Sequence, residues 1–193
     1  MRIFLAGASG VIGVRLVPLL VGGGHVVAGM TRTPEKAGPL RSLGADPVVC
    51  DVYDADALRD AVVAFRADAI VDLLTDLPDD EDSIPRFEAA NARMRRDGTR
   101  NLLAAARASG TSRFVAQSVA WELGGDAGGA VREHERAVLE AGGVVLRYGQ
   151  FYGPGTYFEH EEPTPPRIHV DVAARRTVPA LEAAPGVILV TEA

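Results

Sequence analysis

Short apolar runs alternate along the chain with longer stretches in which apolar residues recur every three to four positions. The short runs predict β-strands at residues 3–6, 25–30, 47–50, 69–74, 113–117 and 144–148. The longer stretches predict helices at residues 11–21, 34–43, 55–66, 84–109 and 131–141, with glycine stop signals at Gly22, Gly44, Gly110 and Gly142. This alternation predicts an α/β fold: a doubly wound parallel sheet with helices on both faces and strand order 3-2-1-4-5-6.

The first predicted strand runs directly into a spaced glycine motif, after which the helical pattern begins. In this strand–turn–helix setting the first glycine permits a tight turn, the second lets backbone N–H groups approach a pyrophosphate, and the third lets the helix pack closely. The helix N-terminus adds unpaired N–H groups and the positive end of its dipole. The motif therefore predicts a Rossmann-like dinucleotide site formed by Gly7, Ser9, Gly10, Val11, Ile12 and Gly13.

The residues after the second and third predicted strands bear on the choice of dinucleotide. NAD-binding proteins usually place an acidic residue after the second strand, but this chain has Arg32 there, followed by Lys36. Arginine binds phosphate in a bidentate manner, which favours NADP over NAD. After the third strand, Asp51 and Val52 are placed to contact the adenine; for Asp51 a loop or helix-capping role is the alternative.

The pattern changes beyond Tyr148. A Gly-Pro-Gly turn at 153–155 and an acidic, proline-rich stretch at 159–166 predict a loop, followed by a helix at 170–183 and a strand at 187–190. The glycine-rich segment between Trp121 and Glu133 is expected to be flexible. We therefore expect one domain over residues 1–193, in which residues 151–193 form a reduced substrate-side region.

Composition narrows the possible partners and cofactors. The 193 residues are 47% hydrophobic with a net charge of −6, so the chain can bury one core and offers no basic surface for nucleic acid or an anionic membrane. No signal-peptide pattern precedes the glycine motif, which favours the cytoplasm. Cys50 is the only cysteine and the four histidines show no ligand spacing, so neither a disulfide nor a metal site is expected.

Several longer stretches are distinctive together: GASGVIG (7–13), CDVYDADAL (50–58), VDLLTDLP (71–78), GTRNLLAAARASGTSRFVAQS (98–118), LRYGQFYGPGT (146–156) and RIHVDVAA (167–174). They resemble the NAD-dependent epimerase/dehydratase family, the extended and atypical short-chain dehydrogenases. The resemblance implies that Ser118 hydrogen-bonds a substrate oxygen and that the segment from Tyr148 to Tyr152 runs beside the nicotinamide. It also implies cofactor contacts from Leu73, Leu74 and Thr75, and a late loop with His169 and Asp171 that closes the site.

The chain departs from that family at the catalytic pair. Lys36 is the only lysine and no tyrosine has a lysine four residues later, so the usual tyrosine–lysine pair is absent. If Glu135 is aligned with the glutamate that follows the pair in the family, Ala127 stands in place of the tyrosine and Val131 in place of the lysine. The substrate region of the family is also much reduced, because about a dozen residues replace it.

A general acid or base would then come from elsewhere. The candidates are Tyr148, Tyr152, Tyr157, His134, Glu133 and Glu135. For His134, on a charged helix, the alternative is a solvated surface position, and for the tyrosines it is a core position with a satisfied hydroxyl.

Three functions remain open at this point. The first is an NADP(H)-dependent oxidoreductase acting on a small carbonyl or sugar-like or specialised metabolite. The second is a redox-neutral cyclase, isomerase or dehydratase, and the third a non-catalytic module that senses NADP(H). Family members commonly pair through the two helices found here at 84–109 and 131–141, so the resemblance also implies a homodimer.

Overall fold

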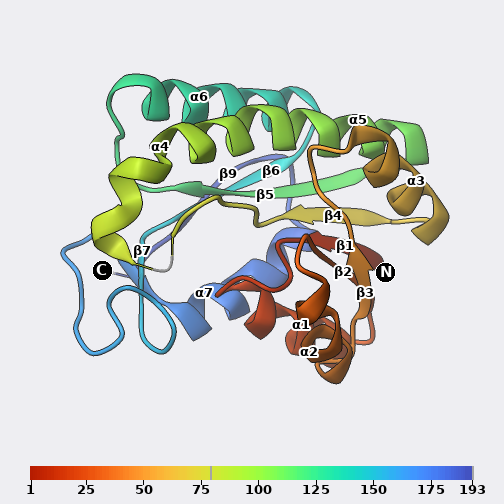
Figure 1. The fold of residues 1–193 in the computed structure, drawn as a ribbon, viewed down its shortest axis with the longest axis horizontal. Coiled ribbons are helices and arrows are strands. Elements are labelled where there is room, and N and C mark those ends of the chain that lie inside the picture. Colours follow the sequence, from red (N-terminus) through yellow and green to blue (C-terminus); the bar gives the residue numbers. More distant parts are fainter. Residues whose placement is uncertain (79, 193) are drawn as a thin grey trace.

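A parallel sheet forms the centre of the protein in a computed structural model that describes residues 1–78 and 80–192 (Figure 1). Within this part of the chain the sheet has seven strands in the order β3-β2-β1-β4-β5-β6-β9. They are β1 (Arg2–Ala6), β2 (Val26–Thr31), β3 (Asp46–Val49), β4 (Ala69–Asp72), β5 (Arg113–Val119), β6 (Val144–Tyr148) and β9 (Gly186–Val190). The predicted order 3-2-1-4-5-6 is confirmed, and β9 continues the sheet beside β6.

The apolar runs became strands because the central ones are buried on both faces. Ile3, Phe4 and Leu5 of β1 have no exposed surface, and all four residues of β4 are buried. A continuous apolar run is typical of a parallel strand covered by helices on both sides. The sheet is therefore the core of the molecule and fixes where its carboxyl edge, and any ligand, must lie.

Two helical layers cover the sheet (Figure 1). The layer that includes α1 (Gly13–Gly22), α2 (Ala37–Ser42) and α7 (Val170–Thr177) lies below it in the view, and α3 to α6 lie above it. The upper layer comprises α3 (Ala55–Phe65), α4 (Ile84–Arg93), α5 (Thr99–Ser109) and α6 (Gly125–Glu140). No helix in residues 1–78 and 80–192 combines the length and the apolar character needed to cross a membrane.

Three predicted helices are more irregular than their patterns indicated. The helix predicted at 84–109 consists of α4 and α5 joined by a π-helical turn, η3 (Met94–Gly98). The helix predicted at 34–43 begins as the 3₁₀ turn η1 (Pro34–Lys36), and the last one continues after α7 as the 3₁₀ turn η4 (Val178–Leu181). A further 3₁₀ turn, η2 (Glu81–Ser83), precedes α4.

The expectation of a flexible segment between Trp121 and Glu133 was wrong. Helix α6 begins at Gly125, six residues before the predicted start at Val131, and includes most of the glycine-rich run. A Cβ on Gly128 would lie 1.9 Å from the carbonyl oxygen of Leu123, so glycine lets the preceding loop pack directly on the helix. Close packing rather than flexibility explains this glycine.

The region after β6 is compact. Strand β7 (Gln150–Tyr152) pairs in parallel with β8 (Arg167–His169), and α7 follows β8 directly. The acidic stretch at 159–166 contains no helix or strand, as its composition predicted. Figure 1 shows this loop at the end of the molecule where β7, α4 and α7 meet.

Candidate functional site

The glycine motif forms a tight turn between β1 and α1. Gly7 has a φ of +81°, and a Cβ there would lie 2.9 Å from the carbonyl carbon of Leu73. A Cβ on Gly13 would lie 2.3 Å from the carbonyl oxygen of Gly7. A Cβ on Gly10 would meet only that same oxygen, at 3.3 Å, so this residue borders open space. The turn thus requires glycine at its two ends and leaves its middle accessible.

The backbone of this turn is suited to an anion. Among residues 1–78 and 80–192, no acceptor is bonded to the N–H groups of Ser9, Val11 and Ile12. No acidic residue occupies the first turn of α1. Free N–H groups at a helix N-terminus bind phosphate, and the three glycines leave room for it. The turn therefore fits the pyrophosphate of a dinucleotide.

Arg32 and Lys36 lie beyond the end of β2. The Ser9 hydroxyl is 3.1 Å from the Thr31 hydroxyl, which connects the glycine turn with the end of this strand. Arg32 is largely exposed, and its Nη2 atom lies 3.0 Å from Oδ1 of Asp76, while Lys36 is exposed at the end of η1. The cationic edge predicted for a 2′-phosphate is present, but Asp76, which sequence reasoning missed, is its partner.

Asp51 and Val52 follow β3. Oδ1 of Asp51 accepts a hydrogen bond of 2.9 Å from the N–H of Tyr53, so the carboxylate stabilises the turn before α3. Val52 is buried, and its carbonyl oxygen accepts from Nδ2 of Asn101 at 2.9 Å. This geometry supports the loop-capping interpretation of Asp51, and the adenine contact stays a prediction.

The end of β4 is held rigidly against the glycine turn. The N–H of Leu73 donates to Ala6 in β1, and the N–H of Leu74 donates to Oδ1 of Asp72 at 3.0 Å. Nε2 of Gln117 donates to the carbonyl of Leu74 at 3.0 Å. The segment that continues through Thr75 therefore lies beside Gly7, where the resemblance places cofactor contacts.

Ser118, at the end of β5, donates a hydrogen bond of 2.5 Å to Oε1 of Glu135. The same carboxylate accepts from Nε and Nη2 of Arg147 in β6, at 2.9 and 2.5 Å. Burial raises the pKa of Glu135, but the hydrogen bonds from Arg147 and Ser118 outweigh burial and hold that pKa below its usual value. The Ser118 proton is thus committed to Glu135, which stays ionised.

His134 is buried, so the solvated surface position that was the alternative to a catalytic role is wrong. The ring is 3% exposed, its Nε2 donates to the carbonyl of Gln117 at 2.9 Å, and its Nδ1 lies 2.6 Å from Oγ1 of Thr99. Burial, together with the charge of Arg95, lowers the pKa of His134 to about 4. His134 lies on the side of α6 that faces β5 and α5, so its two ring nitrogens stabilise the packing of these three elements.

The three candidate tyrosines make separate contacts. Tyr148 is buried, its hydroxyl lies 2.6 Å from Oγ1 of Thr177, and burial raises its pKa far above the ordinary value. Tyr152 donates to Oε2 of Glu192 at 2.7 Å, a bond that raises the pKa of Tyr152. The Tyr157 hydroxyl donates to the carbonyl of Pro78. For Tyr148 the core interpretation fits this geometry best.

The late loop is tied to the start of α7. Nδ1 of His169 accepts from the N–H of Asp171 at 3.2 Å and caps α7, and the His169 ring packs edge-on against Tyr152. A Cβ on Gly153 would lie 2.5 Å from Nε2 of His169, so glycine permits this contact. Asp171 in turn pairs with Arg15 of α1. The start of α7 is therefore tied to α1 beside the glycine turn, and the closing of the site by this loop stays a prediction.

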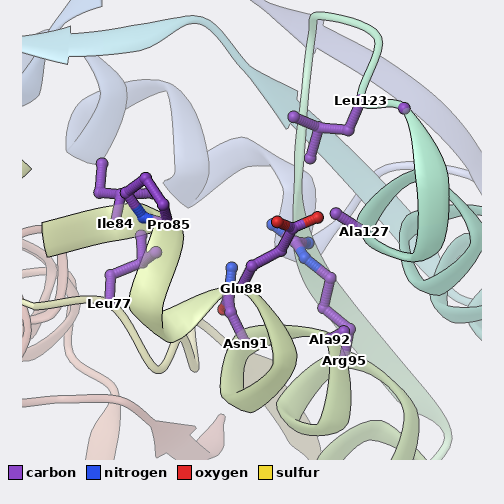
Figure 2. Close-up of a pocket in the computed structure, with 10 residues that line it drawn as sticks. Leu77, Ile84, Pro85, Glu88, Asn91, Ala92, Arg95, Leu123 and Ala127 are labelled. Carbon is purple, nitrogen blue, oxygen red and sulfur yellow. The ribbon is translucent and has the colours of Figure 1, made fainter.

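A pocket of about 280 Å³ opens between α4 and the start of α6 (Figure 2). Its walls are mainly apolar, and its charged members are Glu88 and Arg95. The lining residues are Leu77, Ile84, Pro85, Glu88, Asn91, Ala92, Arg95, Leu123, Gly124 and Ala127. Ala127, the position that the resemblance assigns to the missing tyrosine, thus borders a cavity.

Two buried charged residues near this pocket escaped the sequence analysis. Asp72 is 4% exposed and Arg95 is 7% exposed. Burial raises the pKa of Asp72 to about 6, although the Leu74 N–H and Arg95 oppose that shift. Asp72 could have been found, because a carboxylate inside the apolar run of β4 is unusual. Arg95 lies in a stretch of charged residues, where nothing in the sequence marks it as buried. No group of three or more His, Cys, Asp and Glu side chains in residues 1–78 and 80–192 is arranged for a metal ion.

Comparisons with known proteins show the family of the chain. A family model described as NAD(P)H-binding matches residues 7–142. A 3-diazoavenalumate denitrifying reductase from a Streptomyces species is 35% identical over 235 aligned residues, which cover 100% of this chain and 76% of the relative.

Solved structures with a similar fold share less sequence. The UDP-glucose 4-epimerase of Thermotoga maritima, solved with UDP-glucose, superimposes with a TM-score of 0.81 at 19% identity, covering 99% of this chain and 77% of that one. The UDP-glucose 4-epimerase of Thermus thermophilus, solved with NAD, gives a TM-score of 0.81 at 18% identity, covering 99% and 78%. These matches establish the Rossmann-like fold.

Proposed function

Because the chain belongs to the NAD(P)H-binding family, we propose that it is an NADP(H)-dependent reductase of a small specialised metabolite. The proposal joins two observations: a turn that fits a pyrophosphate, and a pocket bordered by Ala127, the position that the resemblance assigns to the missing tyrosine. The relative named as a reductase of a diazo compound supports the same class of reaction.

The cofactor preference rests on the edge beyond β2. The N–H groups of Val11 and Ile12 would hold the pyrophosphate, and Arg32 with Lys36 would face a 2′-phosphate. Arg32 would exchange Asp76 for that phosphate, since its own side chain is 58% exposed and the pair is a single contact at the surface. These residues support NADP over NAD.

The absence of the family's tyrosine–lysine pair is the observation that shapes the proposed chemistry. Ser118 donates to an ionised Glu135 that Arg147 already neutralises, and Tyr148 has its hydroxyl buried against Thr177. When bound, NADPH supplies a hydride. The residues around it then need only position the substrate and exclude water, provided that the substrate accepts a hydride without a proton from the protein.

An aryl diazonium ion is such a substrate. The hydride brings the electron pair of the new C–H bond, while the C–N bond breaks and its electron pair leaves with N₂. No proton is transferred, so the step balances without a general acid. This class of reaction agrees with the name of the Streptomyces diazo reductase, which aligns with the whole of this chain at 35% identity.

The test combines binding with turnover. Calorimetric titration with NADP⁺, NADPH, NAD⁺ and NADH should give the tightest binding for NADPH, and Arg32→Ala should lose most of that preference while Arg41→Ala, an exposed arginine of α2, keeps it. An aryl diazonium salt should then oxidise NADPH with release of one N₂ per turnover. Binding of none of the four dinucleotides would overturn the proposal, as would NADPH binding without oxidation by a diazonium or carbonyl panel.

A further inference from the structure

The pocket of Figure 2 lies where this fold places its ligands. Leu77 follows β4, and Leu123 and Gly124 follow β5, so the pocket opens beyond the carboxyl ends of two adjacent strands. In doubly wound sheets ligands bind at this edge. A volume of about 280 Å³ suits a small, slender molecule, since it is just below the ~300–1,000 Å³ typical of ligand pockets.

The walls of the pocket favour an apolar, flat occupant. Leu77, Ile84 and Pro85 form one side, and Leu123 and Ala127 face them in Figure 2. The methyl group of Ala127 leaves free the space that a tyrosine at this position would fill. The residue change that removed the family's proton donor therefore also made room for a ligand.

Arg95 is an unusual member of this lining. It is only 7% exposed on the π-helical turn η3, and it forms no ion pair and donates no side-chain hydrogen bond within residues 1–78 and 80–192. π-helical turns occur often at functional sites. A guanidinium has five N–H donors, and within the described residues no fully buried side-chain nitrogen lacks a hydrogen-bond partner, so the unbonded donors of Arg95 reach open space. Because Arg95 lines the pocket, these donors are available there to an acceptor on a ligand.

The charges near Arg95 do not supply that acceptor. Glu135 is held by Arg147 and Ser118, and Asp72 accepts from the N–H of Leu74. Burial lowers the pKa of Arg95, while the charges of Asp72 and Glu135 raise it, and an arginine stays charged in proteins. One buried positive charge therefore remains at the apolar pocket.

Glu88 is the other charged side chain at this pocket. It is exposed, and Figure 2 shows its carboxylate and the Arg95 guanidinium reaching into the same space between α4 and α6. Within the described residues, no ion pair joins the two side chains. An exposed glutamate can turn into solvent, so it weakens the binding of an anion without preventing it.

We propose that this pocket is the substrate pocket and that it binds a flat, largely apolar carboxylic acid, whose carboxylate pairs with Arg95. The inference rests on the proposed function, because it names the substrate class of that reductase. Planar, bidentate recognition of a carboxylate is what an arginine does best. The carboxylate supplies the acceptor that Arg95 lacks, and the apolar body fills the space beside Ala127.

The test uses cinnamate and its uncharged amide as probes, with the whole chain and with NADP⁺ either saturating or absent. Trp121 is the only tryptophan and lies two residues before Leu123, so its fluorescence reports occupancy alongside calorimetry. Cinnamate should bind about tenfold more tightly than the amide, because only its carboxylate can form a charge-assisted pair with Arg95. Arg95→Gln should bring this ratio to about one, and Arg95→Lys should keep part of it.

Further variants separate the pocket from effects on folding. Ala127→Leu fills the cavity and should weaken both probes, whereas Glu88→Gln should strengthen only cinnamate. Arg93→Gln, at an exposed arginine on the same helix, should change neither probe, and unchanged NADP⁺ binding shows that each variant is folded.

Two results would overturn the assignment. One is equal binding of cinnamate and its amide by the wild type, and the other is no binding of either by a protein that still binds NADP⁺. Cinnamate binding that depends on Arg95 in a protein that fails to bind any dinucleotide would support the pocket and count against the proposed function alone.

Discussion

Arg15 in the first turns of α1 and Asp171 at the start of α7 form an ion pair, with 2.7 Å between Nε and Oδ1. The same guanidinium donates to the carbonyl of Val11 at 2.8 Å and to that of Pro154 at 2.5 Å. One side chain thus connects the glycine turn with the loop after β7 and with α7. The late part of the chain is positioned by this contact beside the dinucleotide turn.

Arg15→Gln should therefore loosen the loop at 153–166 and lower dinucleotide affinity by about tenfold, because three connections are lost together. Limited proteolysis of that loop and calorimetry with NADPH measure the two effects. Asp171→Asn keeps two of the three contacts of Arg15, and the Asp171 carboxylate is half-exposed, so its cost should stay below about 1 kcal/mol. Equal effects of the two variants would contradict this account.

Asp76→Asn should raise NADPH affinity several-fold and leave NADH affinity unchanged. The substitution removes the carboxylate that pairs with Arg32 at 3.0 Å, so the guanidinium becomes available to a 2′-phosphate. The backbone N–H of Asp76, which donates to Asn91, is retained. Parallel titrations with NADPH and NADH measure the change, and an equal gain for both dinucleotides would show that Arg32 does not face the phosphate.

Gly128→Ala should destabilise the protein by about 2–3 kcal/mol, because the new methyl would meet the carbonyl oxygen of Leu123 at 1.9 Å. Gly129→Ala is the matched control, since the nearest atom, in the flexible side chain of Arg96, would be 3.4 Å away. That change should be neutral or stabilise by up to about 1 kcal/mol through helix propensity. Urea denaturation measures the free energy of unfolding of both variants. Equal values for the two would contradict the close packing of Leu123 on Gly128.

Two buried groups, His134 and Asp72, should make the stability of the folded state depend on pH. Burial lowers the pKa of His134 from 6.5 to about 4 and raises that of Asp72 from 3.8 to about 6. As the pH falls from 6.5 to about 4, the unfolded chain binds a proton at His134 before the folded chain does, so the folded state loses stability. As the pH falls from about 6, the folded chain binds a proton at Asp72 first, so stability is gained.

These two contributions oppose each other, and substitutions should separate them. The stability advantage of the wild type over His134→Gln should shrink by about 3 kcal/mol between pH 6.5 and 4. Its advantage over Asp72→Asn should grow by about 3 kcal/mol between pH 6 and 3.8. Denaturant titrations between pH 6.5 and 3.8 measure the free energy of unfolding of the wild type and of each variant. If a variant follows the same pH dependence as the wild type, the substituted group is not buried as described.

Light scattering should give twice the 20.3 kDa mass of one chain. This homodimer is proposed through α4, α5 and α6, which lie together on one face of the sheet in Figure 1. Phe87 of α4 and Leu139 of α6 are partly exposed there and would be covered in the dimer. A measured mass equal to that of one chain would show that the protein is a monomer and would contradict the proposal.

The strands were predictable because their apolar runs are continuous and both faces of the sheet are covered. Residues 3–6 and 69–74 contain the buried cores of β1 and β4, and the glycine motif between a strand and a helix located the dinucleotide turn. The Asp76 partner of Arg32 was not predictable, because 44 residues separate the two in the sequence. The same holds for the bond from Ser118 to Glu135, which depends on how α6 packs on β5 and β6.

By itself, the sequence determined the sheet order, the position of the phosphate-binding turn and the absence of the tyrosine–lysine pair, because these follow from local pattern and residue identity. Only the tertiary structure decided that His134 is buried and neutral, that the glycines before it begin a helix, and that Arg95, among the described residues, is left without a partner beside an apolar pocket. Burial and pairing of polar groups depend on elements far apart in the chain, and periodicity within one element does not report them.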